Sequence, residues 1–344
     1  MYRIYRRSFL KVGGLSLGAL ALPRSFRSRP LEGFPEGDRL CRVTEIEVDL
    51  HSGPRPSARV VATRRLDDVL VLLREVVGTG TYPHNHVWFE TPEGYLWSAD
   101  AQPVTNSPNP VEPAIPEDGL WTEVSVPYTE GRTKADPTAP VRYRLYYSMV
   151  LNVNQMVAGA DGRTWYRVED ENGIVMFAPG EAFRVILPEE IEPIGTGLEE
   201  KVLRVNLERQ DLSAVEDGVE VYYCRISSGY AFDRDGKRVW NTPIGQNWTW
   251  RKMVSRHMSG GDRVSGYDLP GVGWTILFSG TGAAVHSTYW HNDFGTPRSR
   301  GCINVLPEDA KWLFRWSNPA VPYRPGDLTS LFPNPGTPVI VREA

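Results

Sequence analysis

The sequence predicts a mainly β protein made of several small units, and three observations lead to this prediction. The chain has 344 residues, which is more than one ordinary core holds, so two or three domains are expected. It contains 32 Gly, 28 Pro and 11 Trp, a composition that favours short strands and tight turns over helix bundles. Short apolar runs separated by turn residues recur from the first hundred residues onward, for example at 60–62 and 68–73.

Composition and charge exclude some classes of function. Hydrophobic residues make up 41% and charged residues 23% of the chain, which are globular values. The formal net charge is -4, and no dense Lys/Arg stripe follows the N-terminus, so nucleic acid is not an expected partner. The three cysteines, at 41, 224 and 302, form no disulfide framework. Cys41 and Cys224 either pair or stay free, and at least one thiol is unpaired.

The N-terminal 30 residues have the pattern of an export signal. Arg6 and Arg7 precede an uncharged segment, Val12 to Leu22, that is too short to span a bilayer comfortably. Paired arginines before such a segment resemble a twin-arginine signal, which implies an exported protein of the cell envelope. No A-x-A site is clear, so residues 1–30 are either cleaved or kept as an N-terminal membrane anchor. The alternative is a basic, disordered N-terminus.

Residues 40–105 read as short strands joined by turns. The Ser52-Gly53-Pro54 turn, the strand that carries Trp88, and Gly94-Tyr95-Leu96-Trp97 occur in an order that resembles a bacterial SH3-like domain. The resemblance implies a barrel module that binds cell-wall peptides or glycans.

The next segment, 106–140, is rich in Pro, Ser, Thr and Asn and predicts a linker. Beyond it, Trp165-Tyr166-Arg167-Val168 mirrors the Trp88 strand, and 188–194 mirrors the ending at 99–104. These matches predict a divergent second SH3-like domain over 141–196.

The region from 198 to 342 opens with alternating strands and contains a histidine and cysteine in suggestive positions. Cys302 follows His286 by sixteen residues. A thiol with an ordinary pKa needs a base beside it to act as a nucleophile, and His286 is the candidate. Two short strands joined by a loop of about this length can bring the two side chains together. Pro307-Glu308-Asp309 then predicts the start of a helix.

These residues resemble a known catalytic signature. His286-Ser287, Gly295 and Ser299-Arg300-Gly301-Cys302-Ile303-Asn304, with the turn Thr242-Pro243-Ile244-Gly245, resemble the L,D-transpeptidases of the YkuD type over 198–342. The resemblance implies a β-sandwich catalytic domain with a short helix after the cysteine. It also implies Cys302 as nucleophile, His286 as base, Ser287 as the residue whose carbonyl orients His286, and the Gly301 and Cys302 amides as oxyanion donors.

Further residues are expected to bind substrate. They are Ser299, Arg300 and Asn304 in the signature, Trp290 and His291 near its rim, and Tyr267 in a 257–270 segment that is either a surface loop or a flap over the site. Arg300 is a departure, because the family usually has histidine there. We expect Arg300 to favour the thiolate or to contact a substrate carboxylate.

The implied function is peptidoglycan cross-linking by acyl transfer from a stem tetrapeptide through a Cys302 thioester, without cofactor or metal. His286, His291 and Cys302 lack the compact spacing of a zinc site. One alternative is a Cys/His peptidase, either an L,D-carboxypeptidase or an NlpC/P60-like enzyme, although in the latter the cysteine precedes the histidine. The other is a non-catalytic wall-binding protein, which the Arg300 departure supports.

Overall fold

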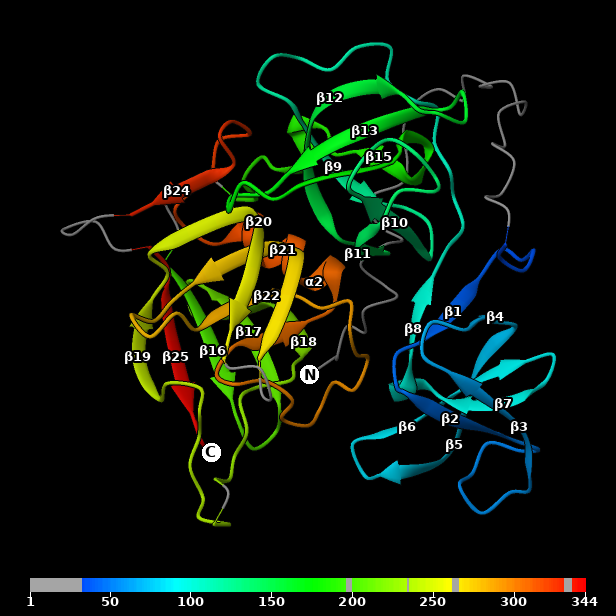
Figure 1. The fold of residues 1–344 in the computed structure, drawn as a ribbon. Helices are drawn as coiled ribbons and strands as arrows, with labels where there is room; N and C mark the ends of the chain where they lie inside the picture. The colour runs from blue at the N-terminus through cyan, green and yellow to red at the C-terminus, as the bar shows by residue number, and fades with distance from the viewer. Residues whose placement is uncertain (1–32, 196–199, 234, 262–265, 331–335) are drawn as a thin grey trace, which may run out of the picture.

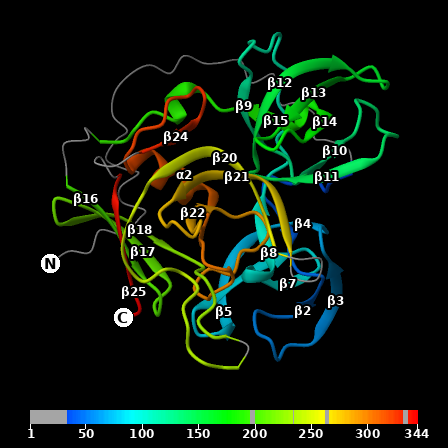
Figure 2. The same cartoon turned by 60° about the vertical axis from the view of Figure 1, so that its left-hand side comes forward.

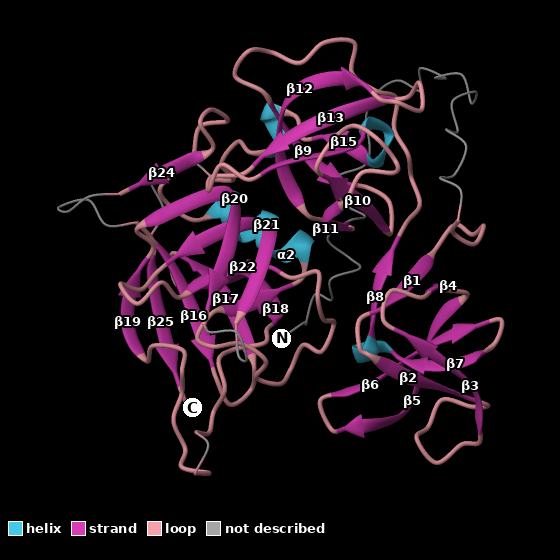
Figure 3. Cartoon of the chain, in the orientation of Figure 1, coloured by secondary structure: helices cyan, strands magenta, loops and turns pink. Residues whose placement is uncertain are grey.

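The computed structural model describes residues 33–195, 200–233, 235–261, 266–330 and 336–344. Figure 1 shows three β units: an N-terminal unit (33–105, blue to cyan), a middle unit (106–195, green) and a C-terminal unit (200–344, yellow-green to red). A mainly β fold is therefore confirmed (Figure 3). The expected export signal lies outside the described residues. Within those residues, no helix has the length and apolar character needed to cross a membrane.

The N-terminal unit packs a three-stranded sheet, β4-β1-β8, against a five-stranded sheet, β3-β2-β7-β6-β5. Its core contains Leu50, Phe89 and Leu96. Trp88 and Trp97, the neighbours of Phe89 and Leu96, are also buried and form a second cluster with Ala99. Its elements are β1 (Leu40–Val43), β2 (Glu47–His51), β3 (Val60–Arg65), β4 (Val69–Val71), β5 (Arg74–Tyr82), β6 (Asn85–Thr91), β7 (Gly94–Trp97), the 3-10 turn η1 (Ser98–Asp100) and β8 (Ala101–Val104).

The middle unit is a single seven-stranded sheet in the order β11-β10-β14-β13-β12-β9-β15. Its core contains Leu145, Val168 and Met176. Its elements are β9 (Leu120–Val124), β10 (Tyr128–Arg132), β11 (Val141–Tyr146), β12 (Val150–Ala158), β13 (Thr164–Glu169), β14 (Val175–Pro179), η2 (Gly180–Ala182), β15 (Phe183–Val185) and η3 (Pro188–Glu190).

The strands of these two units pair in the same order. β1 pairs with β4 and β8, and β9 pairs with β12 and β15; β2 pairs with β3 and β7, and β10 pairs with β11 and β14. β12 is one continuous strand at the position where the N-terminal unit has two, β4 and β5. The turn before β4 and the turn before β12 each contain a non-glycine residue at positive φ, Asp67 at 72° and Ser148 at 69°. The two units are thus copies of one topology.

The shared topology corrects two predicted boundaries. β9 and β10 lie within 106–140, so the second copy begins inside the segment predicted to be a linker. Most of the Pro, Ser and Thr residues that suggested a linker belong to the strand-free stretch 106–119 and to the 133–140 hairpin loop. The counterpart of β8 is β15, at Phe183–Val185 after η2, and the predicted match at 188–194 is instead η3 and the residues after it.

The C-terminal unit is a two-sheet sandwich with one α-helix. One sheet has the order β18-β17-β16-β25-β19 and the other β23-β22-β21-β20-β24. Its elements are β16 (Lys201–Asn206), β17 (Asp211–Glu216), β18 (Val219–Arg225), β19 (Gly245–Trp248), β20 (Arg251–Gly260), β21 (Tyr267–Leu277), β22 (Ala284–Ser287), β23 (Ile303–Val305), α2 (Pro307–Trp316), β24 (Asp327–Thr329) and β25 (Pro338–Arg342).

The core of this unit lies between the two sheets and α2. Leu203 of β16, Val285 of β22 and Leu313 of α2 all have no exposed surface. The predicted helix after the cysteine is present, and it begins with proline and two acidic residues at its positive end. Lys252 of β20 is buried, and its Nζ donates to the carbonyl oxygens of Phe314, Ser317 and Pro319 at 2.5, 2.6 and 2.7 Å. These hydrogen bonds link the C-terminal end of α2 to β20.

All three units meet at one buried arginine. The Arg42 guanidinium of the N-terminal unit contacts the Asp67 carboxylate at 2.8 Å and donates to the Tyr289 carbonyl of the C-terminal unit at 2.5 Å. It also lies 4.2 Å from the ring centroid of Tyr146 in the middle unit, and that ring stacks on Tyr289. A second view likewise shows the three units packed around one another (Figure 2). The 288–301 loop of the C-terminal unit is therefore supported by both other units.

Candidate active site

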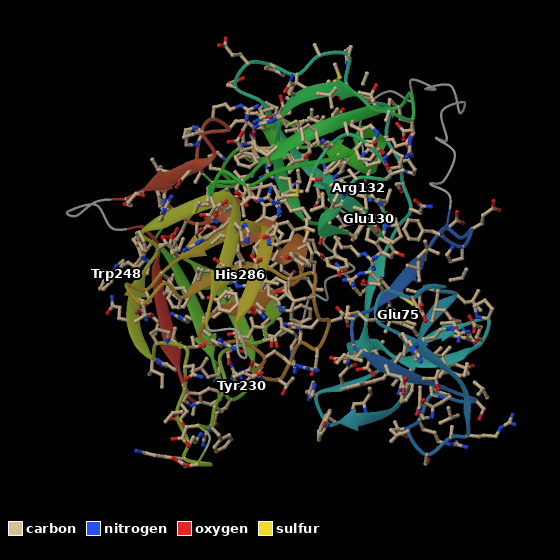
Figure 4. All side chains as sticks on the ribbon, in the orientation of Figure 1. Glu75, Glu130, Arg132, Tyr230, Trp248 and His286 are labelled. Carbon is tan, nitrogen blue, oxygen red and sulfur yellow. The ribbon has the colours of Figure 1, made fainter. Side chains whose placement is uncertain are left out.

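Strand pairing places His286 and Cys302 on the same face of one sheet. β22 and β23 run parallel, with Val285 opposite Ile303 and His286 opposite Asn304. Cys302 is the residue before Ile303, so its side chain lies on the His286 side because side chains alternate between faces. The opposite face, with Val285 and Ile303, belongs to the core. Figure 4 places His286 in the middle of the C-terminal unit.

The contacts of His286 determine its tautomer. Its Nδ1 lies 2.9 Å from the backbone carbonyl oxygen of Ser287. A carbonyl oxygen only accepts, so Nδ1 carries the hydrogen and Nε2 keeps the lone pair that a base requires. His286 is only 2% exposed. Burial lowers its pKa to about 4, the Ser287 hydrogen bond opposes this shift, and the charge of Arg256 adds to it. The imidazole is neutral at pH 7 and can accept a proton.

Cys302 is half-buried against apolar side chains. It packs on the cluster formed by Met253, Leu277 and Ala284. Burial raises the pKa of its thiol, while a backbone hydrogen bond from Ala284 and the positive charge of Arg256 lower it in part. The resting thiol is therefore protonated at neutral pH, so a nucleophilic Cys302 needs a base to take its proton.

The turn before the cysteine is fixed by its own hydrogen bonds. The Ser299 hydroxyl donates to the Cys302 carbonyl at 2.6 Å and accepts from the Gly301 N–H at 3.1 Å. Ser299 therefore shapes the turn, whereas the sequence predicted a substrate contact. The Gly301 amide, predicted to be an oxyanion donor, is already engaged.

Position 301 requires glycine for two reasons. Its φ of +136° is strained for any other residue, and a Cβ there would lie 2.9 Å from the carbonyl oxygen of Asn241. Thr242, the residue after Asn241, belongs to the Thr242-Pro243-Ile244-Gly245 turn. Its hydroxyl accepts from the Gly229 N–H at 2.8 Å, and a Cβ on Gly229 would lie 2.9 Å from Gly301 Cα. The Thr242 turn thus supports the backbone next to Cys302.

Three predicted substrate-binding residues have different surroundings. The Trp290 ring lies 5.7 Å, centroid to centroid, from the His286 ring and packs beside it. His291 and Asn304, in contrast, are 5% and 1% exposed, and the Asn304 amide nitrogen lies 2.8 Å from His291 Nε2. These two residues are buried and bonded to each other, so they support the site from within the protein; that they contact substrate stays a prediction. Burial, together with the charges of Arg298 and His286, lowers the pKa of His291 to about 3.

Tyr267 and Arg300 meet at the edge of the site. Tyr267 begins β21 and is 42% exposed, and the Arg300 guanidinium carbon lies 5.6 Å from its ring centroid. The sequence allowed either a loop or a flap for the 257–270 segment. Residues 257–260 and 267–270 of this segment belong to the paired strands β20 and β21. The contact between Tyr267 and Arg300 connects these strands to the turn before Cys302.

The N-terminal unit holds the far end of the 288–301 loop. Asn292 Nδ2 donates to the Ser98 carbonyl at 2.8 Å, and His84 Nε2 lies 3.0 Å from an Asp293 carboxylate oxygen. Arg298 contacts the same carboxylate at 2.8 Å. The loop between the histidine and the cysteine is thus positioned by contacts that span the units.

Sequence reasoning missed Arg256. It lies in β20, and its charge acts on both His286 and Cys302. Nothing in the alternation of β20 marks this residue, because the register of the β20–β21 pair shifts at this point. Among the residues that the structure describes, no group of three or more His, Cys, Asp or Glu side chains is arranged to hold a metal.

Residues 200–341, less than half of the chain, match the family model of YkuD, the L,D-transpeptidase catalytic domain. This match coincides with the C-terminal unit and includes His286 and Cys302. No curated protein matches the chain in sequence.

Several solved structures resemble the chain in part. A mutant of the Enterococcus faecium L,D-transpeptidase is 25% identical; the match covers 42% of this chain and 50% of that chain, with a TM-score of 0.31. This chain therefore spans half the length of that protein. The NMR structure of the catalytic domain from the E. faecium enzyme is 25% identical, with coverage of 43% and 100% and a TM-score of 0.31. L,D-transpeptidase 3 from Mycobacterium tuberculosis is 19% identical, with coverage of 56% and 91% and a TM-score of 0.31.

Proposed function

We propose that the protein is a peptidoglycan L,D-transpeptidase, on the premise that residues 200–341 match the L,D-transpeptidase catalytic domain. The observation that carries the proposal is the pair on one sheet face: a neutral His286 with Nδ1 bound to the Ser287 carbonyl, and a half-buried Cys302 thiol in the neighbouring strand. In this proposal Cys302 is the nucleophile, His286 the base, and Ser287 the residue that orients it.

The chemistry follows from these protonation states. His286 Nε2 takes the thiol proton, and the sulfur attacks the carbonyl before the terminal D-amino acid of a stem tetrapeptide. The C–N bond breaks, the leaving amine takes the proton from His286, and a thioester remains on Cys302. An amine of a neighbouring stem then attacks the thioester and gives a proton to His286; the C–S bond breaks, the new peptide bond forms the cross-link, and the released Cys302 thiolate takes the proton back from His286. The thioester keeps the acyl potential of the original peptide bond, so the transfer needs no nucleotide.

The Cys302 backbone amide is the proposed oxyanion donor. The Gly301 N–H joins it only if it leaves the Ser299 hydroxyl, to which it donates at 3.1 Å. Trp290, beside His286, and the pair of Tyr267 and Arg300 are the proposed substrate contacts. Arg300 occupies the position of the usual family histidine and is auxiliary in this scheme, because His286 already supplies the base.

The two repeated units complete the proposal. We infer that the N-terminal and middle units are SH3-like modules that bind wall peptides or glycans, with boundaries at 40–105 and about 120–195. The protein is exported, through the twin-arginine route and by way of residues 1–30, to the compartment that contains the cell wall. The contacts of Arg42 with the Tyr289 carbonyl and the Tyr146 ring couple these modules to the catalytic unit.

Incubation of the purified protein with a disaccharide-tetrapeptide, followed by mass spectrometry, tests the reaction. A dimer that lacks one D-Ala supports transfer, a bare tripeptide means hydrolysis by an L,D-carboxypeptidase, and no product means a wall-binding protein. Cys302→Ala is the matched control and should yield no product. An NlpC/P60-like peptidase would cleave elsewhere in the stem and give a different mass.

A further inference from the structure

We propose that Arg256 binds the terminal carboxylate of the acyl donor, which makes the site selective for peptides that end in a free carboxylate one residue beyond the attacked carbonyl. This inference deepens the proposed function and rests on it for the identity of the donor. Among the described residues, it assigns a role to the one charged side chain whose charge acts on both Cys302 and His286.

Strand geometry places Arg256 on the catalytic face. The residues on either side of Arg256 both contact the middle unit: Ser255 donates through its hydroxyl to the Val150 carbonyl, and the His257 ring contacts the Asp170 carboxylate. Arg256 therefore points to the other side of β20. There its charge acts on both His286 and Cys302.

The surroundings favour an anion at this point. Cys302 packs against Met253, Leu277 and Ala284, which offer no charge. Arg256 is half-buried and forms no ion pair or side-chain hydrogen bond with any residue in the described part of the chain. A carboxylate that enters an apolar neighbourhood needs a cationic partner, and a guanidinium can bind both of its oxygens.

The structure of the donor determines where its carboxylate must lie. In the proposed donor, the free carboxylate lies one residue beyond the carbonyl that Cys302 attacks, a span of about 4 Å. Arg256 holds this group while the C–N bond breaks. The released D-amino acid then carries the carboxylate away, so the acyl-enzyme no longer occupies Arg256.

Paired alkylating agents test the proposal without requiring any peptidoglycan activity. Iodoacetate carries a carboxylate, and iodoacetamide is its neutral counterpart; both react with the Cys302 thiolate. Their rate ratio at one pH cancels the thiolate fraction, and division by the same ratio for free cysteine cancels their intrinsic reactivity. Cys41 and Cys224 are 0% and 2% exposed, so labelling should occur at Cys302, with Cys302→Ala as the check.

The wild type should prefer iodoacetate by about three- to tenfold after this correction. Arg256→Gln should bring the ratio to about one, and Arg256→Lys should retain most of the preference. Arg251→Gln, on the same strand but paired with Asp327, is the matched control and should leave the ratio unchanged. An equal ratio in the wild type and Arg256→Gln would overturn the proposal.

A second measurement uses the wild type alone, in case Arg256→Gln does not fold. D-Alanine should slow the alkylation of Cys302 by iodoacetamide, and D-alaninamide, which has no carboxylate, should not. Equal protection by both compounds, or by neither, would contradict a carboxylate site. Loss of transpeptidation with a normal alkylation preference would instead refute the proposed function and leave the role of Arg256 standing.

Discussion

Acid should destabilise the catalytic unit through two buried histidines. The pKa of His286 falls to about 4 and that of His291 to about 3, against 6.5 for the exposed side chain, because both are buried. Well above pH 6.5 both histidines are neutral in the folded and unfolded chains, so they add no pH dependence there. Below pH 6.5 the unfolded chain binds protons that the folded chain cannot, and stability falls until the folded pKa values are reached.

The size of this loss follows from the shifts. At pH 5 each histidine is about 1.5 pH units below its unfolded pKa and still above its folded pKa, so each costs about 2 kcal/mol and the pair about 4 kcal/mol relative to pH 7. His291→Gln removes one of the two titrating groups. The loss between pH 7 and pH 5 should therefore be smaller in this variant by about 2 kcal/mol.

Hydrogen exchange of the β22 and β23 amides, corrected for the intrinsic rate at each pH, measures this loss in the catalytic unit itself. His86→Gln is the control, because His86 is exposed in the N-terminal unit and should not alter the difference. If wild type and His291→Gln lose the same free energy between pH 7 and pH 5, the burial argument for His291 is refuted.

Other consequences concern individual side chains. Arg300→His should change turnover by less than about tenfold, because His286 already supplies the base; recovery of activity in an otherwise inactive protein would contradict this. Lys252→Met should destabilise the protein by about 3 kcal/mol or more in urea unfolding, since three buried carbonyls lose their donor. Gly301→Ala should lower turnover and cost about 1–3 kcal/mol in stability, because φ there is +136° and the added Cβ meets Asn241. The carboxylates of Asp170 and Asp268 outweigh the effect of burial and raise the pKa of His257, so exchange in β20 should quicken as pH rises past that value in wild type but not in His257→Gln.

Local signals made the C-terminal unit predictable from sequence. The strand around His286, the glycine before Cys302 and the proline with two acids at the start of α2 each have a local physical cause, and each lies where expected. The fold class was predictable for the same reason, since alternation and turn residues are local patterns.

Properties that depend on distant pairing were not predictable. His291 and Asn304 were expected to bind substrate, and their sequence positions do not show that the two side chains meet in the interior. No local sequence pattern distinguishes Arg256, and the face of the sheet to which its side chain points depends on the pairing of β20 with β21. The second repeat was placed too late because proline-rich loops flank β9 and β10, and because β9 pairs with strands far along the chain, β12 and β15.

The central claim is that Cys302 forms a thioester with help from His286, and the intact mass of the protein tests it most directly. After rapid mixing with a tetrapeptide and no amine acceptor, the wild type should gain the mass of the peptide without its terminal D-amino acid, and peptide mapping should locate it at Cys302. His286→Gln should acylate at least about a hundredfold more slowly, and Cys302→Ala should gain no mass. An adduct on another residue, or product formed at the wild-type rate by Cys302→Ala, would contradict the account.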